Sequence, residues 1–244
     1  AFILGSLLLP SSVSAQFNWP YKVTNGKAVT EVPVRTAGQE SALNMTTPKL
    51  KVVRVAFVGL GMRGHDAVER WTHIPGIQVM ALCDYERDRA ERCQEYLRKA
   101  SMPAADIYSG EDGYKELCKR KDIDLVYIAP DWKHHFLVAY EAMNNGKHVA
   151  VEVPAAMNLT EIWKLIDISE KKRLHCMMLE NCCYDFFELN SLNMAQNNVF
   201  GEVLYVQGAY RHELSKFWDA YWKKDAQDKL GWRLDYNQKF RGDV

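Results

Sequence analysis

The sequence has no excess of charge of either sign and no apolar run long enough to cross a membrane. Thirty-one basic residues balance thirty-one acidic ones among 244, so no net field favours nucleic acid or an anionic membrane surface. The apolar run at residues 1–10 is shorter than the ~20 residues that a spanning helix requires. A hydrophobic share of 48% is typical of a globular protein with a sizeable core. From the charge balance and the short apolar run we predict no nucleic-acid partner and no membrane span.

Cysteine is scarce and shows no metal-binding spacing. The sequence has six cysteines and no Cys-X-X-Cys pair, which argues against a zinc site. Two of them, Cys182 and Cys183, are adjacent and therefore too close in sequence for an ordinary disulfide. We predict no metal site and interpret all six cysteines as small buried hydrophobic side chains.

The N-terminal segment differs in composition from the rest of the chain. The apolar residues 1–10 are followed by small residues that end at Ala15, a pattern typical of the end of a secretory signal peptide. It predicts an exported, periplasmic protein; the alternative is an apolar tail that packs on the domain. Residues 16–50 are polar and contain several turn signals, so we predict an N-terminal arm or linker there.

From residue 51 short apolar segments alternate with amphipathic ones. Strands are predicted at 52–58, 77–83, 125–129, 148–152 and 174–179, and helices at 64–73, 87–100, 114–118, 136–144 and 160–172. Asn158 is a predicted helix N-cap, and Gly146 a predicted left-handed residue after a helix. The alternation predicts an α/β fold with a parallel sheet. We assign residues 51–180 to one Rossmann-type domain.

The pattern changes near Asn181. A helix predicted at 184–196 precedes a longer predicted strand at 203–210. The chain then becomes rich in Trp, Lys and Asp and stops without a closing element. We therefore expect residues 181–244 to be the start of a second domain that binds substrate and is incomplete here.

Three glycines predict a dinucleotide-binding loop. Gly59, Gly61 and Gly64 follow the strand at 52–58 and open the next helix, which is the context that this fingerprint requires. The first glycine permits a tight turn, the second lets the backbone approach a pyrophosphate, and the third allows the helix to pack closely on the strand. The helix N-terminus supplies N–H groups and a positive dipole to the phosphates.

Asp84, at the end of the next strand, predicts which dinucleotide binds. A carboxylate in this place accepts hydrogen bonds from the ribose hydroxyls of NAD and repels the 2′-phosphate of NADP. NAD is therefore the predicted cofactor. Arg87 is near enough in sequence to weaken this selection, unless it lies on the outer face of its helix.

Polar residues also follow the later strands, at the carboxyl edge where ligands of open parallel sheets bind. We predict that they line the sites of the ribose and the nicotinamide. They are Trp132, Lys133, His134 and His135 after the strand at 125–129, Glu152 and Val153 after the strand at 148–152, and Asn181 after the strand at 174–179. The alternative for His134 and His135 is capping of the helix that follows them.

The motifs of residues 50–244 resemble the glucose–fructose oxidoreductase and inositol dehydrogenase (Gfo/Idh/MocA) superfamily. The resemblance implies that a second domain, with a largely antiparallel sheet, follows the Rossmann domain, and that Met62 and Arg63 also contact NAD. Most oxidoreductases of the superfamily carry a lysine between the glutamate and the proline of Glu152–Pro154, and that lysine helps to move the hydroxyl proton of the substrate. This chain has Val153 there, which cannot carry a proton.

The segments EVPAAMN at 152–158 and LENCCYDFFELN at 179–190 resemble glycoside hydrolase family 109, NAD-dependent α-N-acetylgalactosaminidases within this superfamily. The resemblance implies oxidation at carbon 3 of a terminal α-N-acetylgalactosamine, elimination of the aglycone, addition of water and re-reduction. It places Tyr210 and Arg233 against the substrate. Tyr184 and His212 are the candidates for proton transfer, although Tyr184 could simply start a helix and His212 could bond a core carbonyl.

Two other functions stay open at this stage. An ordinary NAD-dependent sugar dehydrogenase would need a proton-transfer group in place of the missing lysine. A non-catalytic protein that binds NAD or a sugar would leave Tyr184 and His212 without a chemical role. We also expect that the protein can form a homo-oligomer. A protein consisting of residues 1–244 alone is expected to be catalytically inactive.

Overall fold

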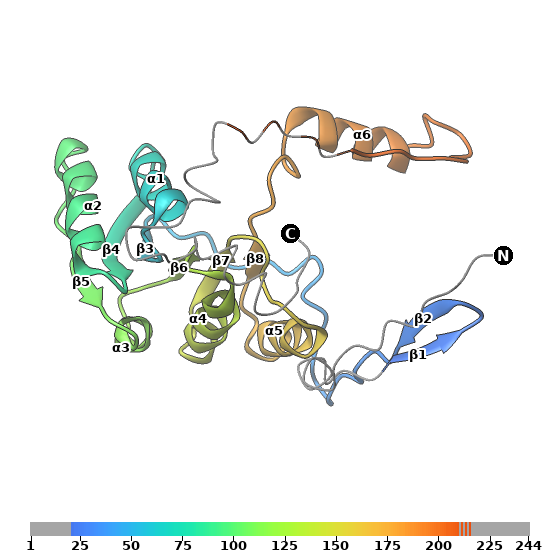
Figure 1. Ribbon diagram of the computed structural model, residues 1–244, viewed down its shortest axis with the longest axis horizontal. Coiled ribbons are helices and arrows are strands. Elements are labelled where there is room, and N and C mark those ends of the chain that lie inside the picture. The colour runs from blue at the N-terminus through green and yellow to red at the C-terminus, as the bar shows by residue number, and fades with distance from the viewer. Residues whose placement is uncertain (1–20, 210, 212, 214, 216–244) are drawn as a thin grey trace. The chain divides into compact units, whose positions relative to one another are not determined.

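The computed structural model describes residues 21–209, 211, 213 and 215 of the chain (Figure 1). By their internal contacts the residues group into two compact units, 1–180 and 181–244. The first unit contains an N-terminal hairpin and arm followed by a layered α/β domain. The second contains one described helix.

A six-stranded parallel sheet forms the centre of the first unit, with the strand order β5–β4–β3–β6–β7–β8. The strands are β3 (Val53–Val58), β4 (Ile77–Asp84), β5 (Asp106–Ser109), β6 (Leu125–Ile128), β7 (His148–Val151) and β8 (Cys176–Met178). The chain runs outward in one direction from β3 to β5 and then returns to build β6 to β8 on the other side of β3. This is the strand order of the Rossmann fold, with its switch point between β3 and β6. The predicted parallel α/β architecture is confirmed.

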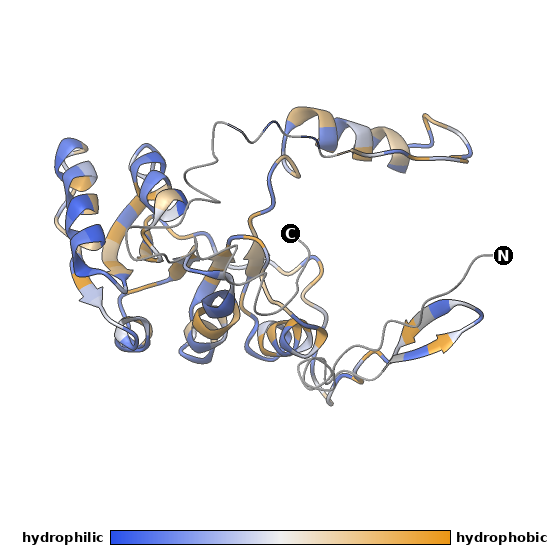
Figure 2. Ribbon diagram, in the orientation of Figure 1, coloured by the Kyte–Doolittle hydropathy of each residue, from blue (hydrophilic) through white to orange (hydrophobic). Residues whose placement is uncertain are grey.

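Helices cover both faces of this sheet (Figure 1). They are α1 (Met62–Trp71), α2 (Arg87–Lys99), α3 (Gly113–Lys119), α4 (Trp132–Asn144) and α5 (Leu159–Lys172). Alternate residues of β3 point to opposite faces: Val55 and Phe57 pack in a cluster with α1 and α2, whereas Ala56 and Val58 pack with α3, α4 and α5. Figure 2 shows the strands as largely hydrophobic and α2 as mainly hydrophilic, because only one stripe of α2 faces the core.

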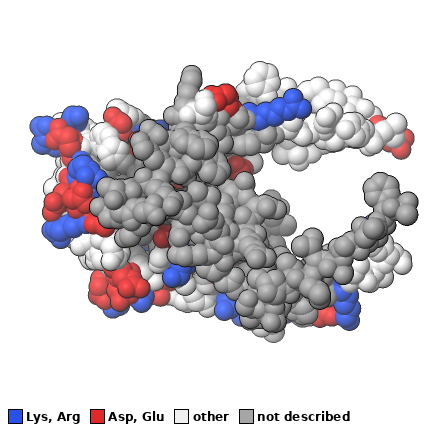
Figure 3. Space-filling view, in the orientation of Figure 1, with Lys and Arg blue, Asp and Glu red and all other residues white. Residues whose placement is uncertain are grey.

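The helix ends follow the predicted capping. The Asn158 side chain accepts a hydrogen bond from the N–H of Glu161 at 2.9 Å, which caps α5. Gly146, with φ 78°, terminates α4 in the left-handed conformation that glycine adopts without strain. Acidic and basic residues alternate over the exposed surface of α2 and α3 (Figure 3), and pairs such as Arg92–Asp88, at 2.6 Å, lie one helical turn apart.

The N-terminal segment, predicted as an arm or linker, also contains an antiparallel hairpin. Strands β1 (Tyr21–Thr24) and β2 (Lys27–Thr30) are joined by Asn25 and Gly26, both with positive φ. An Asn-Gly pair favours this two-residue turn. The strands were missed because neither is long enough to show an apolar alternation. The short strand β5 was missed for the same reason.

A buried carboxylate of α5 anchors the arm, and Arg173 at the end of the same helix donates hydrogen bonds to the Glu40 and Ser41 carbonyl oxygens at 3.1 Å. The Arg35 guanidinium donates two hydrogen bonds to Glu170, at 2.8 and 2.9 Å, and the Gln39 amide donates a third at 2.9 Å. These bonds, the one from Arg35 first, lower the pKa of Glu170 to about 2. The arm therefore contacts the domain at a defined point and is more than a polar linker.

The second unit confirms one sequence-based prediction and corrects another. Helix α6 (Phe186–Gln196) is present as predicted, but residues 203–209 form no strand, and Tyr210 lies outside the described residues. A strand needs a partner to satisfy its N–H and C=O groups, and none of the described residues pairs with this segment.

The cysteines only partly follow the expectation of burial. Cys83, Cys93 and Cys118 are buried and Cys176 is half-buried, but Cys182 and Cys183 are exposed. That prediction was wrong for the adjacent pair, which lies in a loop before α6 and not in the preceding strand. Within the described part of the chain all six thiols are free, and no three metal-ligating side chains cluster. None of the helices described there is long and apolar enough to cross a membrane.

Candidate cofactor-binding site

Two of the three loop glycines are required by the packing of the protein itself. Gly59 follows β3 with φ 87°, and a Cβ atom placed on it would lie 2.2 Å from the backbone nitrogen of Pro130 after β6. A Cβ atom on Gly64 would lie 1.7 Å from the carbonyl oxygen of Gly59. Both distances are far below van der Waals contact. These glycines let β3, β6 and α1 meet at the switch point of the sheet.

The third glycine is not required by packing. A Cβ atom on Gly61 would meet no atom within 4 Å, and its φ of −69° suits any residue. Gly61 is the N-cap of α1, where no side chain caps the helix and the first turn contains no acidic residue. The open space, the helix dipole and the absence of a competing carboxylate are what a pyrophosphate requires. The loop therefore fits the diphosphate of a dinucleotide.

Asp84 is bonded to this loop. Its buried carboxylate accepts hydrogen bonds from the N–H of Leu60 at 2.6 Å and from the N–H of Glu86 at 3.0 Å. The Arg89 guanidinium approaches the same carboxylate at 3.3 Å. Asp84 thus connects the end of β4 with the loop after β3, and its orientation is fixed before a ribose binds.

Arg87, considered above as a competitor for the ribose position, points elsewhere. It pairs with Glu91 at 2.9 Å, one turn further along α2. The interpretation of Arg87 as an arginine on the helix face is therefore confirmed. The cation beside Asp84 is Arg89, which the sequence analysis did not single out because α2 carries several arginines.

At the end of β6 the polar segment begins α4. Asp131 is the N-cap and accepts a hydrogen bond from the N–H of His134 at 3.1 Å, while the His134 ring nitrogen Nδ1 lies 2.8 Å from the same carboxylate. Trp132 is buried and Lys133 is exposed. His134 therefore takes part in the helix start, as the alternative interpretation held, and its contact with a cofactor stays a prediction.

His135 holds the loop that follows β7. It is buried, and its Nδ1–H donates to the carbonyl oxygen of Pro154 at 2.7 Å. Burial lowers the pKa of His135, so the ring is neutral at neutral pH. Val153, half-buried in that loop, precedes a cis peptide bond to Pro154. His135 thereby positions the backbone next to the residue that replaces the lysine.

Glu152 connects three elements of the site. Its carboxylate oxygen Oε1 accepts a hydrogen bond from the Tyr127 hydroxyl of β6 at 2.6 Å and lies 3.6 Å from Nε of Arg63 at the start of α1. Burial, followed by the bond to Glu152, raises the pKa of Tyr127, so the hydroxyl keeps its proton. Tyr127 was missed because it lies within an apolar strand and looks like an ordinary core residue.

The remaining predicted site residues are not brought together by the described structure. Met62 is exposed at the start of α1. Asn181 and Tyr184 belong to the second unit, where Tyr184 is exposed and precedes α6. Tyr210, His212 and Arg233 lie outside the described residues. The roles of these residues stay predictions.

The strand order, the glycine loop and the anchored Asp84 define a dinucleotide-binding Rossmann protein. A family model described as "Oxidoreductase family, NAD-binding Rossmann fold" (Gfo/Idh/MocA) matches residues 53–180, which is more than half of the 244 residues. The chain belongs to this NAD-binding oxidoreductase family, and the predicted cofactor is confirmed.

Relatives with high identity are named after a glycoside hydrolase family. Glycosyl hydrolase family 109 protein 5 of Phocaeicola vulgatus is 64% identical over 243 residues, which cover 98% of this chain and 46% of the relative. Glycosyl hydrolase family 109 protein 1 of Bacteroides fragilis is 62% identical over 216 residues, covering 88% and 45%. The predicted resemblance is confirmed. The chain spans about half the length of these relatives.

Solved structures support the fold. The myo-inositol 2-dehydrogenase of Lactobacillus plantarum superposes with a TM-score of 0.54 at 21% identity, over 64% of this chain and 44% of that one. The myo-inositol dehydrogenase of Lactobacillus casei, solved with NAD(H) and myo-inositol, gives 0.53 at 22% identity over 62% and 43%. At this identity the likeness concerns the fold alone.

Proposed function

We propose that the complete protein is an NAD-dependent glycoside hydrolase that releases terminal α-N-acetylgalactosamine. The observation that carries the proposal is Val153 at the carboxyl end of β7, within the cofactor-binding edge of the sheet. Most oxidoreductases of this superfamily use a lysine there, and valine has no group that donates or accepts a proton. The names of the relatives that are about 60% identical support the same conclusion.

The residues of the first unit hold the cofactor. The N-terminus of α1 and the space beside Gly61 would take the pyrophosphate, and Asp84 the adenosine ribose. When bound, NAD supplies a reversible oxidation at carbon 3 of the sugar, which acidifies the hydrogen at carbon 2 and allows the aglycone to be eliminated. Trp132, Lys133 and His134 are proposed to complete the cofactor site, together with Met62 and Arg63.

The family resemblance implies proton transfer by residues that follow the Rossmann domain. We assign it to His212 and Tyr184, and substrate binding to Tyr210 and Arg233. In the Rossmann unit, Val153 has no proton to move and the His135 ring is engaged at Nδ1 with Pro154. The Tyr127 hydroxyl donates its hydrogen bond to Glu152, and we assign both side chains to positioning the loop after β7.

One assay distinguishes this function from the two alternatives. The complete protein is incubated with a chromogenic α-N-acetylgalactosaminide while aglycone release and the absorbance of NADH are both followed. Aglycone release without accumulation of NADH supports the proposal. NADH formed in proportion to substrate indicates a sugar dehydrogenase, and the absence of both signals indicates a non-catalytic binding protein.

A second part of the proposal concerns the setting of the enzyme. Residues 1–15, which lie outside the described residues, suit the end of a signal peptide, and we propose that the protein is exported to the periplasm. A glycan with terminal α-N-acetylgalactosamine is the proposed substrate, and a homo-oligomer the proposed assembly. Fractionation of cells, with an N-terminal sequence of the mature protein, tests cleavage after Ala15.

A further inference from the structure

Two adjacent cysteines, Cys182 and Cys183, lie in the turn before α6 with both side chains exposed and both thiols free. Cys182 has φ 63°, a left-handed conformation that is uncommon for residues other than glycine. The N–H of Asp185 donates a hydrogen bond to the Cys182 carbonyl oxygen at 2.9 Å. Cys183 and Tyr184 are therefore the two central residues of this turn.

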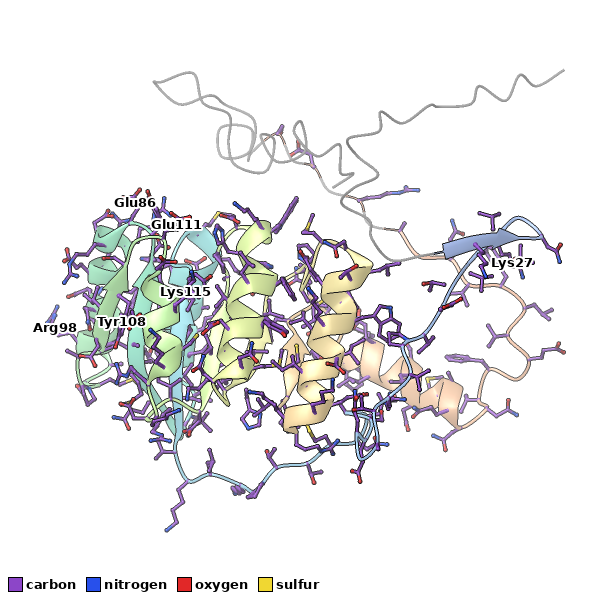
Figure 4. The ribbon with its side chains drawn as sticks, turned by 90° about the horizontal axis from the view of Figure 1, so that it is seen from below. Lys27, Glu86, Arg98, Tyr108, Glu111 and Lys115 are labelled. Carbon is purple, nitrogen blue, oxygen red and sulfur yellow. The ribbon has the colours of Figure 1, made fainter. Side chains whose placement is uncertain are left out.

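The other described cysteines are shielded from reagents. Cys83 of β4 packs against β5 and α3, the elements that carry Tyr108 and Lys115 in Figure 4. Burial raises the pKa of the Cys83 thiol to about 12. It likewise raises the pKa of the three remaining thiols, which are those of Cys93, Cys118 and Cys176. Because the thiolate is the reactive form and has to be reached by the reagent, we expect thiol chemistry of the described residues at the exposed pair.

We propose that Cys182 and Cys183 form a redox-sensitive dithiol, which a disulfide-containing oxidant converts reversibly into a disulfide between the two adjacent residues. Where it concerns activity, the inference rests on the proposed function, in which Tyr184 is a candidate for proton transfer. Closing the ring fixes both cysteine side chains and the peptide between them, and so changes the turn that presents Tyr184. The oxidised protein should therefore release less aglycone than the reduced one.

The reaction is a thiol–disulfide exchange with an oxidant RS–SR. The thiolate of one cysteine attacks a sulfur atom of RS–SR and releases the first thiol RSH, which leaves a mixed disulfide on the protein. The second cysteine attacks the protein sulfur atom of that bond and releases the second RSH. The pair loses two electrons and two protons, and both end on the two molecules of RSH. The export proposed above would bring the pair into a compartment where such oxidants act.

The geometry of adjacent residues favours a disulfide that is easily reduced again. Consecutive Cα atoms lie about 3.8 Å apart, which is below the range of about 4.4–6.8 Å found in most disulfides. Disulfides that depart from the usual geometry, or that are exposed, are the labile and regulatory ones. A bond between Cys182 and Cys183 is therefore expected to respond to the ratio of thiol to disulfide around the protein.

Asp185 slows this exchange. Its carboxylate raises the pKa of the Cys182 thiol, with a smaller contribution from Glu188 in the first turn of α6. The share of reactive thiolate at neutral pH is therefore reduced. Asp185 is the N-cap of α6, but its side chain makes no capping hydrogen bond. Replacing the carboxylate by an amide in Asp185→Asn should accelerate oxidation and leave the start of the helix intact.

The test uses the complete protein, which is first reduced and then equilibrated with oxidised glutathione at a series of thiol-to-disulfide ratios. Intact mass and peptide mapping identify the product, and aglycone release from a chromogenic α-N-acetylgalactosaminide is followed in parallel. We expect the loss of two hydrogen atoms from the peptide that contains Cys182 and Cys183. Aglycone release should fall about tenfold or more, because Tyr184 is displaced, and should return after treatment with a reducing dithiol.

Variants separate the pair from general oxidation. Cys182→Ser/Cys183→Ser should keep its activity in the oxidant, and each single serine variant should take up glutathione without closing a ring. The matched control Cys176→Ser removes a half-buried thiol and should respond to the oxidant as the wild type does. Asp185→Asn should be oxidised about threefold faster or more at neutral pH.

Several results would overturn the inference. One is a pair that keeps both hydrogen atoms at every ratio of thiol to disulfide, and another is a stable glutathione adduct in place of the ring. A ring that forms without lowering aglycone release, or an equal loss of activity in the double serine variant, would remove the link to Tyr184. The peptide mass is measured whether or not glycosides are cleaved. A wild type without hydrolase activity therefore contradicts the proposed function, while the mass still decides whether the disulfide forms.

Discussion

The loops at the carboxyl ends of the strands differ between the two halves of the sheet in how their residues are held. At the end of β3 and β4, glycine geometry and backbone N–H groups fix the loop and Asp84. At the end of β6 and β7, side chains bond to one another and to a carbonyl, through Tyr127, Glu152 and His135. The loop after β3 has no room for a Cβ atom on Gly59 or Gly64, whereas the residues after β6 and β7 are sensitive to the loss of a single polar group. Substitutions in the two regions should therefore reduce stability or NAD binding for different reasons.

The largest effect is expected from a methyl group on Gly64. In Gly64→Ala the new Cβ would lie 1.7 Å from the Gly59 carbonyl oxygen, so the backbone has to move and we expect about 3 kcal/mol or more of lost stability. The matched substitution Gly61→Ala meets no protein atom within 4 Å. It should leave stability within about 0.5 kcal/mol and weaken NAD binding about tenfold or more.

Chemical denaturation and NAD titration of the two variants separate packing from binding. Equal destabilisation by both alanines would show that Gly61 is also a packing residue. Normal NAD affinity in Gly61→Ala would remove the pyrophosphate from its assigned place.

At the β6–β7 end, His135→Ala should destabilise the protein by about 1–3 kcal/mol, because it leaves the Pro154 carbonyl without its buried donor. The pKa of His135 is lowered in the folded protein from its usual 6.5. The unfolded chain therefore binds a proton first as the pH falls below about 6.5, and stability is lost there.

Unfolding free energies at pH 7.5 and 5.5 test this. The wild type should lose more stability than His135→Ala between the two values. The same loss in both proteins would show that His135 does not carry this pH dependence.

A smaller effect is expected from Tyr127→Phe. The change keeps the ring against Phe57 and Trp71, with which Tyr127 packs at centroid distances of 5.2 and 5.5 Å, and removes only the donor to Glu152. We expect a loss of about 1–2 kcal/mol and weaker NAD binding. Since Glu152 also neighbours Arg63, Glu152→Gln in the Tyr127→Phe background should cost less than in the wild type. Strict additivity in this double-mutant cycle would argue against a connected network.

The smallest effect concerns the arm, away from both ends of the edge. Glu170→Gln should lower stability by only about 0.5–1 kcal/mol, because Arg35 is half exposed and screened by solvent. The pKa of Glu170 is lowered from 4.5 to about 2, so its contribution is present above pH 4.5 and fades as the pH falls to 2. Thermal melting at pH 7 and pH 3 should show a difference between wild type and variant that shrinks in acid. Any change in NAD affinity would link the arm to the cofactor site, contrary to expectation.

The difference between the two ends also explains what could be predicted. Gly59 and Gly64 are visible in the sequence because they belong to a glycine motif that follows a strand and opens a helix, and Asp84 because it closes an apolar strand. Tyr127 was hidden by the apolar residues around it, and Arg89 by the other arginines of α2. Side-chain pairs between distant elements, such as Tyr127 with Glu152 or Arg35 with Glu170, leave no periodic pattern.

The second unit shows a different limit. Helix α6 follows from local spacing, but the strand predicted at 203–210 depends on partners that the described residues do not supply. Local sequence indicates where an extended segment is favoured, and pairing decides whether it becomes a strand.

The most direct test of the central claim, that NAD serves hydrolysis here, follows hydrogen at carbon 2 of the sugar. The complete protein would cleave an α-N-acetylgalactosaminide in heavy water, and the released sugar would be examined by NMR. Because elimination removes the hydrogen at carbon 2 and the added water restores it from solvent, we predict deuterium at that position. A product that keeps its original hydrogen at carbon 2 would contradict oxidation and elimination and indicate direct displacement.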